Sequence, residues 1–330
     1  MKTAPESTQG TGTPDRWQSA GHLAVLAATA CWATSGIFVS FIMASSNVSA
    51  LALAFWRDLF TFAILFVSLR LLRPNWLRVQ RSDLKWLAGL GSIGVGTFHV
   101  FWNLNVMLNG VAVATVQQAA MPAIVSVTAW LLWREPLTVR KMAAIILTFT
   151  GTLLVTGLDA LGEISLSLPG LLVGLATPVT YAAYSLFGKP VAGRYRPLAI
   201  LTYGFGFGAL TLLPFQFFTP QPWPVPNLAW VYFAILIAFC TIIPFAAYMF
   251  GLGRLPASVA GTLAMAEIPF AAFYAYVLLG ERLVSTQLAG AALVVGGVLL
   301  LFWRRRPGSQ NRGIRVQRES ANGQEIEVVC

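Results

Sequence analysis

The two halves of this chain repeat each other at a constant offset. Glu135 falls on Glu281 and Gly151 falls on Gly297, and each pair is separated by 146 positions. The stretches that begin at 113 and at 259 align along the same offset. A repeat of this kind limits the fold strongly, because each copy must form the same structural unit and the two units must pack together.

The composition indicates that these units lie in a membrane. With 57% hydrophobic and 10% charged residues, the chain has too little polar surface to cover a soluble globule. A helix needs roughly 20 apolar residues to cross the hydrocarbon core. We predict an all-α membrane protein with ten transmembrane helices, at about 20–43, 50–70, 86–108, 112–133, 139–157, 168–188, 198–218, 228–250, 257–279 and 284–303. The first stretch is too long for a signal-peptide core and a second span follows it, so we expect it to be retained.

The basic residues predict the orientation. If the N-terminus is cytoplasmic, all but two of the 22 lysines and arginines lie on the cytoplasmic side, the exceptions being Arg57 inside the second span and Arg282. The net charge of +10 therefore indicates a membrane surface and no nucleic-acid partner. Five spans per repeat make the second repeat enter the membrane from the opposite side. We predict two inverted five-helix repeats with cytoplasmic N and C termini, an arrangement typical of transporters.

The predicted organisation has four parts. Residues 1–19 form a disordered N-terminal tail, 20–157 the first repeat, 168–303 the second repeat, and 304–330 a basic and polar C-terminal tail. Cys31 and Cys240 fall in predicted spans and Cys330 ends the chain, which is neither a disulfide framework nor a metal-binding spacing.

Motifs of enzymes and pumps do not occur in the sequence. It contains no H-E-x-x-H, G-x-S-x-G or G-x-x-x-x-G-K-[ST], so we expect no enzymatic activity, no cofactor and no metal. The run GLGSIGVG at 89–96 matches the letters of a dinucleotide-binding loop but lies inside an apolar span without a preceding strand. We interpret these glycines as positions where neighbouring helix backbones approach closely.

Polar residues at membrane depth are the candidates for a site, because an ionisable group there costs on the order of a few kcal/mol and usually faces an interior cavity. At 1.5 Å per residue, six of them reach one layer in the outer half: Arg57, Asp58, His99, Asn103, Gln117 and Gln118. Their counterparts in the second repeat are Tyr203, Gly204, Phe245, Met249, Leu263 and Ala264. The polarity is lost in the second copy, which favours a substrate or ion role over an architectural one.

Each of these residues has an alternative role. Arg57 either forms a fork onto a substrate carboxylate, or snorkels to the outer headgroups or pairs with Asp58. Adjacent helical residues point about 100° apart, so we expect Asp58 on another face, where it is a coupling candidate. His99 either titrates during transport or is hydrogen-bonded to a neighbour. The amides are either substrate ligands or interhelical contacts: Asn103, Gln117 and Gln118.

Glu267 is predicted near the midplane of the ninth span, where it either couples transport to protons or makes a structural hydrogen bond as a neutral acid. Pro269 is expected to free a backbone carbonyl beside it. Aromatic and hydroxyl side chains at similar depth either line a cavity or pack: Trp32, Ser35, Trp102, Tyr181, Tyr184 and Tyr248. The segments of Glu135 and Glu281, just before Thr138 and Ser285, are expected to cap the helices that follow them.

Three stretches carry a family resemblance. They are WREPLT at 133–138, LGERLV at 279–284 and AEIPFAAFYAYVLLGER at 266–282. With ten spans in two inverted repeats, the chain resembles the EamA branch of the drug/metabolite transporter superfamily over residues 20–303. It departs from the family where Ile268 separates Glu267 from its proline, and where Trp133 and Arg134 replace the usual Leu-Gly before Glu135.

The resemblance implies a basket-like bundle whose central cavity is built mainly by helices 1, 3, 4, 6, 8 and 9. Members move small metabolites such as amino acids or drugs, often outward, across the bacterial cytoplasmic membrane. We therefore expect a secondary transporter that exports a small-molecule substrate. The alternatives are an uncoupled facilitator or multidrug exporter and, from another class, a non-transporting membrane receptor or scaffold. We expect a monomer that contacts membrane lipid, because two repeats already form a complete pair.

Overall fold

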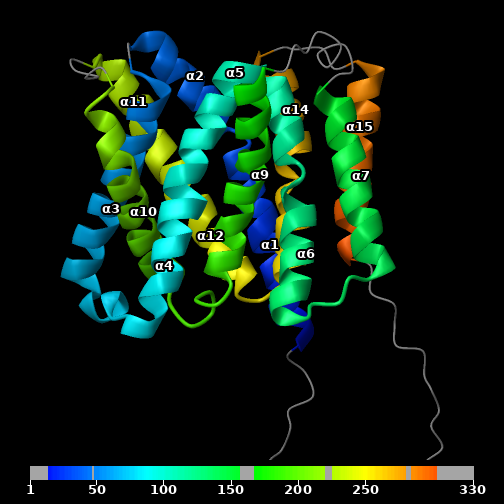
Figure 1. Ribbon diagram of the computed structural model, residues 1–330, viewed down its shortest axis with the longest axis horizontal. Helices are drawn as coiled ribbons and strands as arrows, with labels where there is room; N and C mark the ends of the chain where they lie inside the picture. The colour runs from blue at the N-terminus through cyan, green and yellow to red at the C-terminus, as the bar shows by residue number, and fades with distance from the viewer. Residues whose placement is uncertain (1–13, 47, 157–166, 220–224, 280–283, 303–330) are drawn as a thin grey trace, which may run out of the picture.

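Helices make up almost the whole of the described chain. The computed structural model describes residues 14–46, 48–156, 167–219, 225–279 and 284–302. These residues contain no β-strand beyond an isolated bridge between Ala192 and Tyr195. Figure 1 shows the helices side by side as a bundle, with the start of α1 (Pro14–Trp32) and the end of α15 (Ser285–Phe302) at the same end. The predicted all-α class is confirmed.

The first half of the bundle ends with α7. Its helices are α1, α2 (Ser35–Ser45), α3 (Ala50–Leu72), the short 3-10 turns η1 (Pro74–Leu77) and η2 (Arg81–Asp83), α4 (Leu84–Gly91), the π-helix η3 (Ser92–Thr97), α5 (Phe98–Gln118), α6 (Met121–Trp133) and α7 (Val139–Thr156). The second half comprises α9 (Leu168–Gly188), α10 (Pro197–Gln216), α11 (Asn227–Ile237), the π-helix η4 (Ala238–Ile242), α12 (Ile243–Leu252), α13 (Ala257–Ala264), α14 (Glu267–Leu279) and α15.

Eight described stretches are long and apolar enough to cross a membrane. They are Gln18–Met43, Leu51–Leu72, Val113–Trp133, Leu168–Gly188, Pro197–Gln216, Asn227–Leu252, Ala257–Tyr274 and Ser285–Phe302. Each overlaps a predicted span. The predicted spans 86–108 and 139–157 are helical over their described residues but are not among the eight. The number of ten spans therefore stays a prediction.

The predicted loop at 109–111 is wrong, because α5 continues through it to Gln118. The helix is nevertheless bent: Asn109 Nδ2 lies 3.5 Å from Gln117 Oε1, whereas eight residues of straight helix span about 12 Å. Figure 1 shows α5 at the top of the bundle, between α4 and α6, which stand below it. The chain thus reverses direction within a helix.

Helix breaks recur at the offset of the sequence repeat. The π-helices η3 and η4 begin at Ser92 and Ala238, and α6 and α14 begin at Met121 and Glu267 after two-residue turns at 119–120 and 265–266. Each pair is separated by 146 positions. The predicted helices 112–133 and 257–279 are therefore not continuous.

The turn at 265–266 changes the role predicted for Pro269. This proline lies in the first turn of α14, where its missing N–H has no helical partner to lose. The carbonyl four residues earlier, on Met265, accepts from Ile268 N at 3.1 Å. The expected free carbonyl is thus already bonded, and this expectation is wrong.

The glycine-rich run at 89–96 packs α4 and η3 against α9 and α10. A Cβ on Gly91 would lie 2.3 Å from the carbonyl oxygen of Gly204 on α10. One on Gly94 would lie 2.6 Å from the Cα and N atoms of Tyr184 on α9. Backbone atoms cannot move aside as a flexible side chain can. The interpretation of this run as a close helix approach is confirmed.

Gly94→Ala should lower the free energy of unfolding by about 1–3 kcal/mol, because the added methyl group meets the backbone of α9. The matched control is Gly296→Ala on α15, where nothing lies within 4 Å of the new Cβ and helix propensity should raise stability by up to about 1 kcal/mol. Unfolding followed by tryptophan fluorescence in detergent micelles measures both. Equal changes in the two variants would contradict the packing argument.

Candidate functional site

A buried ionic cluster joins α3 to α5. Asp58 on α3 is fully buried, and its Oδ2 lies 3.3 Å from His99 Nδ1 at the start of α5. The guanidinium of Arg57 contacts His99 Nε2, and its Nε lies 3.9 Å from Asp58 Oδ1. The structure therefore brings together three of the six residues predicted to share one layer. We call them the ionic cluster.

The expectation that Arg57 and Asp58 lie apart is wrong. Their Cα–Cβ directions differ as in any helix, but the long arginine side chain folds back, and His99 lies within reach of both. Only 15% of the Arg57 side chain is exposed. Among the alternatives for Arg57, the structure therefore shows the pairing with Asp58, while a fork onto a substrate carboxylate stays a prediction.

The ionic cluster leaves polar atoms without hydrogen bonds. Gly208 of α10 closes over Asp58, because a Cβ there would lie 3.0 Å from Asp58 Oδ2. Arg57 Nε, Asp58 Oδ1 and the hydroxyl of Thr61, one turn further along α3, are buried without a hydrogen-bond partner. Buried polar atoms are nearly always satisfied in proteins. One donor, one acceptor and one hydroxyl thus remain available to a water molecule or to a ligand.

A second polar cluster forms where α5 bends against α9. Asn105 is fully buried and donates to Thr177 Oγ1 at 3.2 Å. Asn109 donates to Asn105 Oδ1 at 2.6 Å and to the carbonyl of Gly170 at 2.8 Å, and Gln117 approaches it from the other side. Of these residues the sequence analysis selected only Gln117. Asn105 and Asn109 are one helical turn apart, a signal that could have found them.

The remaining predicted polar residues lie along α5. Asn103 is half-buried one turn after His99, and Gln118 is half-buried at the last residue of the helix, just before the turn at 119–120. Trp102 is half-buried and stacks on Phe98 with 6.4 Å between ring centroids. The three stay candidates on the element that carries His99.

Three of the predicted aromatic residues, Trp32, Tyr184 and Tyr248, meet in one cluster between α1, α9 and α12. Phe245 lies 5.0 Å from Trp32 and 5.2 Å from Tyr184, centroid to centroid. Tyr248 lies 5.4 Å from Trp32 and 5.8 Å from Tyr184, and its hydroxyl is 2.7 Å from Ser185 Oγ. Trp32 Nε1 and the Tyr184 hydroxyl are buried without a hydrogen-bond partner. We call the side chains of Trp32, Tyr184, Phe245 and Tyr248 the aromatic cluster.

Phe98 and His99, consecutive residues, connect the ionic cluster to Tyr181, which lies near Tyr184 and Tyr248 of the aromatic cluster. His99 faces Asp58, while Phe98 stacks on Tyr181 with 4.7 Å between centroids. Both follow directly on the π-helix η3, and π segments are frequent at functional sites. Ser35, the last predicted wall residue, is the first residue of α2 and is half-buried.

Glu267 is the first residue of α14, directly after the turn at 265–266. A helix N-terminus favours a carboxylate, because the helix dipole places partial positive charge there. Glu267 is also within electrostatic reach of the Tyr181 hydroxyl. The predicted acid therefore lies beside the aromatic cluster and not beside the ionic cluster. Within the described ranges, no group of three or more His, Cys, Asp and Glu side chains could hold a metal ion.

A family model described as the EamA-like transporter family matches residues 19–157 and 168–303. The chain belongs to the EamA-like transporter family. The resemblance predicted from the sequence is confirmed. With eight apolar helices of sufficient length, this EamA-family protein is a multi-pass membrane protein.

Relatives in several organisms share most of its length. An uncharacterized inner membrane transporter of Salmonella typhimurium, YicL, is 26% identical over 283 residues, which cover 85% of this chain and 94% of YicL. An uncharacterized transporter of Archaeoglobus fulgidus is 27% identical over 283 residues, with 78% and 98% covered. A chain in a crystal structure has the same fold, with a TM-score of 0.73 at 21% identity over 86% of this chain and 96% of that one.

A third polar network in this EamA-family protein joins the first half to the second at the end of the bundle where the described chain begins. Glu135 follows Arg134, whose left-handed backbone (φ 55°) ends α6. Its carboxylate accepts from Ala257 N at 2.9 Å and from the Ser258 hydroxyl at 2.7 Å. Lys141 Nζ lies 3.8 Å away. We call this contact the Glu135 latch.

The Glu135 latch corrects the predicted capping. Glu135 caps α13, whereas α7 is capped by Thr138, which accepts from Lys141 N at 3.3 Å. The capping expected of this segment is therefore confirmed for Thr138 but not for Glu135. Glu281, its counterpart, lies outside the described residues.

Lys189, just after α9, extends the network around the latch. Its ammonium donates to the carbonyl of Leu252, the last residue of α12, and to that of Leu255. Burial lowers the pKa of Lys189, and the Glu135 carboxylate opposes that shift. The ends of α6, α9, α12 and α13 are thus tied together.

Asp58→Ala should lower the free energy of unfolding by about 3 kcal/mol, because it leaves the buried Arg57 guanidinium without its carboxylate. Adding Arg57→Met removes the unpaired cation, so the double variant should lose about 0.5–3 kcal/mol less than the sum of the single variants. Denaturation by SDS in mixed micelles measures the free energy of unfolding of wild type, of the two single variants and of the double variant.

The control cycle pairs Arg57→Met with Asp83→Ala. Asp83 contacts Arg194 and Tyr195, not the ionic cluster, so the losses in this cycle should add. Additive losses for Asp58 and Arg57 as well would mean that the two side chains are not energetically coupled.

Proposed function

We propose that this EamA-family protein is a secondary transporter that exports small metabolites, amino acids among them, by alternating access. The observation that carries the proposal is the ionic cluster: a cation, an anion and an imidazole buried together in a multi-pass membrane protein, with three polar atoms left unsatisfied. Such groups are costly at membrane depth and usually serve a substrate or ion pathway. A receptor or scaffold does not require them.

In this proposal the chain forms ten transmembrane helices in two inverted repeats, with cytoplasmic termini and as a monomer. The paired breaks support the repeats, because η3 and η4, and the turns before α6 and α14, lie at one constant offset. Broken helices that line a central site, and repeats that rock against each other, are common in transporters.

The substrate is proposed to have a carboxylate at one end and a small apolar group at the other. Its carboxylate would replace Asp58 as the partner of Arg57, since a guanidinium pairs well with a planar carboxylate. Its apolar part would face the aromatic cluster across Phe98. His99 and Asp58 contact each other. Both are proposed to change their contacts when the substrate carboxylate replaces Asp58 as the partner of Arg57.

Glu267 is proposed to couple transport to protons. It lies at the end of a broken helix and beside Tyr181, so protonation would change the charge next to the aromatic cluster without touching Arg57. A multidrug exporter is the second candidate: Trp32, Tyr184 and Tyr248 are buried against one another here, and in an open state of the transporter their rings would bind cations. An uncoupled facilitator would lack the role of Glu267.

Counterflow of a labelled amino-acid mixture into proteoliposomes tests this function at two pH values. We expect saturable uptake that Arg57→Ala reduces at least about tenfold, because losing a charge-assisted pair costs about 1.5–3 kcal/mol. Glu267→Gln should retain uptake at a fixed pH and lose its pH dependence. The matched control is Arg70→Ala, on the same helix but exposed at its end.

Three results would count against the amino-acid proposal. Uptake that Arg57→Ala and Arg70→Ala reduce equally would remove Arg57 as the anchor. Exchange of cationic drugs and not of amino acids, unchanged in Arg57→Ala, would favour the multidrug candidate. A well-folded protein that exchanges none of these compounds would favour the receptor or scaffold.

The Glu135 latch is proposed to hold the cytoplasmic end closed. Glu135→Ala should open it, because it removes the contacts to the N-terminus of α13. In a cysteine-free background, Ala260→Cys on the buried face of α13 should then react about tenfold faster with a maleimide. The control Thr138→Ala alters the same loop but caps α7, so it should leave the rate unchanged. Equal rates in the two variants would contradict a latch.

A further inference from the structure

A cavity of about 360 Å³ lies at the end of α3, away from the ionic and aromatic clusters. It is bordered by the last turns of α3, by η1 and by the start of α10, and it is open to the surface of the bundle on one side. Its size falls within the range of small-ligand sites. The residues that line it are Leu65, Ser68, Leu69, Leu72, Arg73, Trp76 and Leu198.

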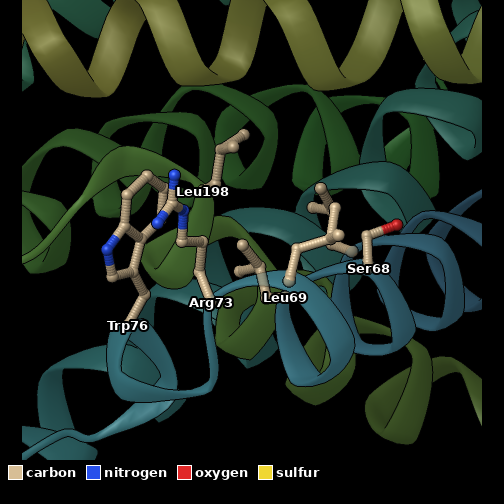
Figure 2. Close-up of a pocket in the computed structure, with 7 residues that line it drawn as sticks. Ser68, Leu69, Arg73, Trp76 and Leu198 are labelled. Atoms are coloured by element: carbon tan, nitrogen blue, oxygen red, sulfur yellow. The ribbon is translucent and has the colours of Figure 1, made fainter.

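The cavity has two chemically different ends. Figure 2 shows the side chains of Arg73 and Trp76 together at one end, with Leu198 beside Arg73 and with Leu69 and Ser68 towards the other end. Leu65 and Leu69 are 5% exposed and form an apolar floor. The cavity is therefore amphipathic along its length.

A second arginine reaches the polar end. The guanidinium of Arg196, the residue before α10, lies over the Trp76 ring at 5.4 Å from its centroid. This cation–π contact fixes a positive charge beside the one that Arg73 supplies. None of the seven lining residues is acidic. Asp83, the one acid in the connection 73–83, is bonded to Tyr195 at 2.7 Å and to Arg194 at 3.4 Å.

The surroundings also favour an anion from the membrane. The connection after α3 carries further exposed arginines, at Arg78 and Arg81, and tryptophan and arginine are typical of the membrane–water interface. Arginine binds phosphate through two parallel hydrogen bonds, and basic pockets between transmembrane helices on the cytoplasmic side bind anionic headgroups.

We propose that this cavity binds one anionic phospholipid. The phosphate lies at Arg73 and Arg196, and one acyl chain lies along Leu65, Leu69 and Leu198. The lipid thereby bridges α3 of the first half and α10 of the second. The site is independent of the proposed transport, because it shares no residue with the ionic or the aromatic cluster.

Native mass spectrometry tests the site on the full-length protein, offered equal amounts of phosphatidylglycerol and phosphatidylethanolamine. Wild type should retain phosphatidylglycerol preferentially. Arg73→Ala and Arg196→Ala should each reduce that preference about fivefold, the effect of one basic residue on an anionic lipid. The matched control is Arg70→Ala, which removes the same charge from the last turn of α3 but does not line the cavity.

Leu198→Trp provides a variant that keeps every charge. The larger apolar side chain narrows the cavity, so it should lower the occupancy of the retained lipid while Arg73 and Arg196 remain. Unfolding midpoints in lipid-free detergent show whether each variant is folded, and lipid should then raise the midpoint of wild type more than that of Arg73→Ala. Equal retention of both lipids by wild type, or equal preference in Arg73→Ala and Arg70→Ala, would overturn the proposal.

Discussion

Every backbone N–H and C=O inside a membrane has to find its partner within the protein, because hydrocarbon offers none. The breaks in this bundle obey that constraint. At η3 the hydroxyl of Thr97 donates to the carbonyl of Ser92 at 2.7 Å, and at η4 that of Thr241 donates to the carbonyl of Leu236 at 2.8 Å. Each threonine satisfies a carbonyl five residues earlier. Side chains thereby support the wide helical turn.

The two-residue turns meet the same requirement in another way. At 119–120 and at 265–266 the amides bond to carbonyls three residues earlier, at 3.0–3.2 Å. The backbone can therefore change direction without an orphaned group. The residues next to these breaks are the ones with chemistry: His99 follows η3, Gln118 precedes the first turn, and Glu267 follows the second. The satisfied breaks thus position the candidate site.

Sequence reasoning predicted the apolar helices and the glycine contacts, because these depend on length, composition and spacing along the chain. It could not predict the direction in which each polar side chain points around its helix. Gln117 and His99 share a predicted layer, yet Gln117 turns to Asn109 and His99 to Asp58. The flexible side chain of Arg57 likewise reached Asp58 against the expectation from helix geometry.

Contacts between segments far apart in the chain could not be predicted from the sequence either. Glu135 bonds to Ala257, 122 residues away, and nothing near either residue distinguishes this partner from the adjacent α7. The bend inside α5 was missed for a related reason: a turn was expected to interrupt the helix, but the amides of Asn105 and Asn109 bond across to α9 while the helix continues.

The two halves of the repeat differ in the polarity of equivalent residues. His99 and Phe245 occupy the same position in the repeat. His99 is the second residue after the π-helix η3, and Phe245 is the third residue after the π-helix η4. One belongs to the ionic cluster and the other to the aromatic cluster. A duplicated scaffold with the same lining twice would bind a substrate in two opposite orientations equally well. A charged side chain in one copy and an aromatic one in the other remove that degeneracy, so in the proposed transport a substrate with one charged and one apolar end would have a single favourable orientation.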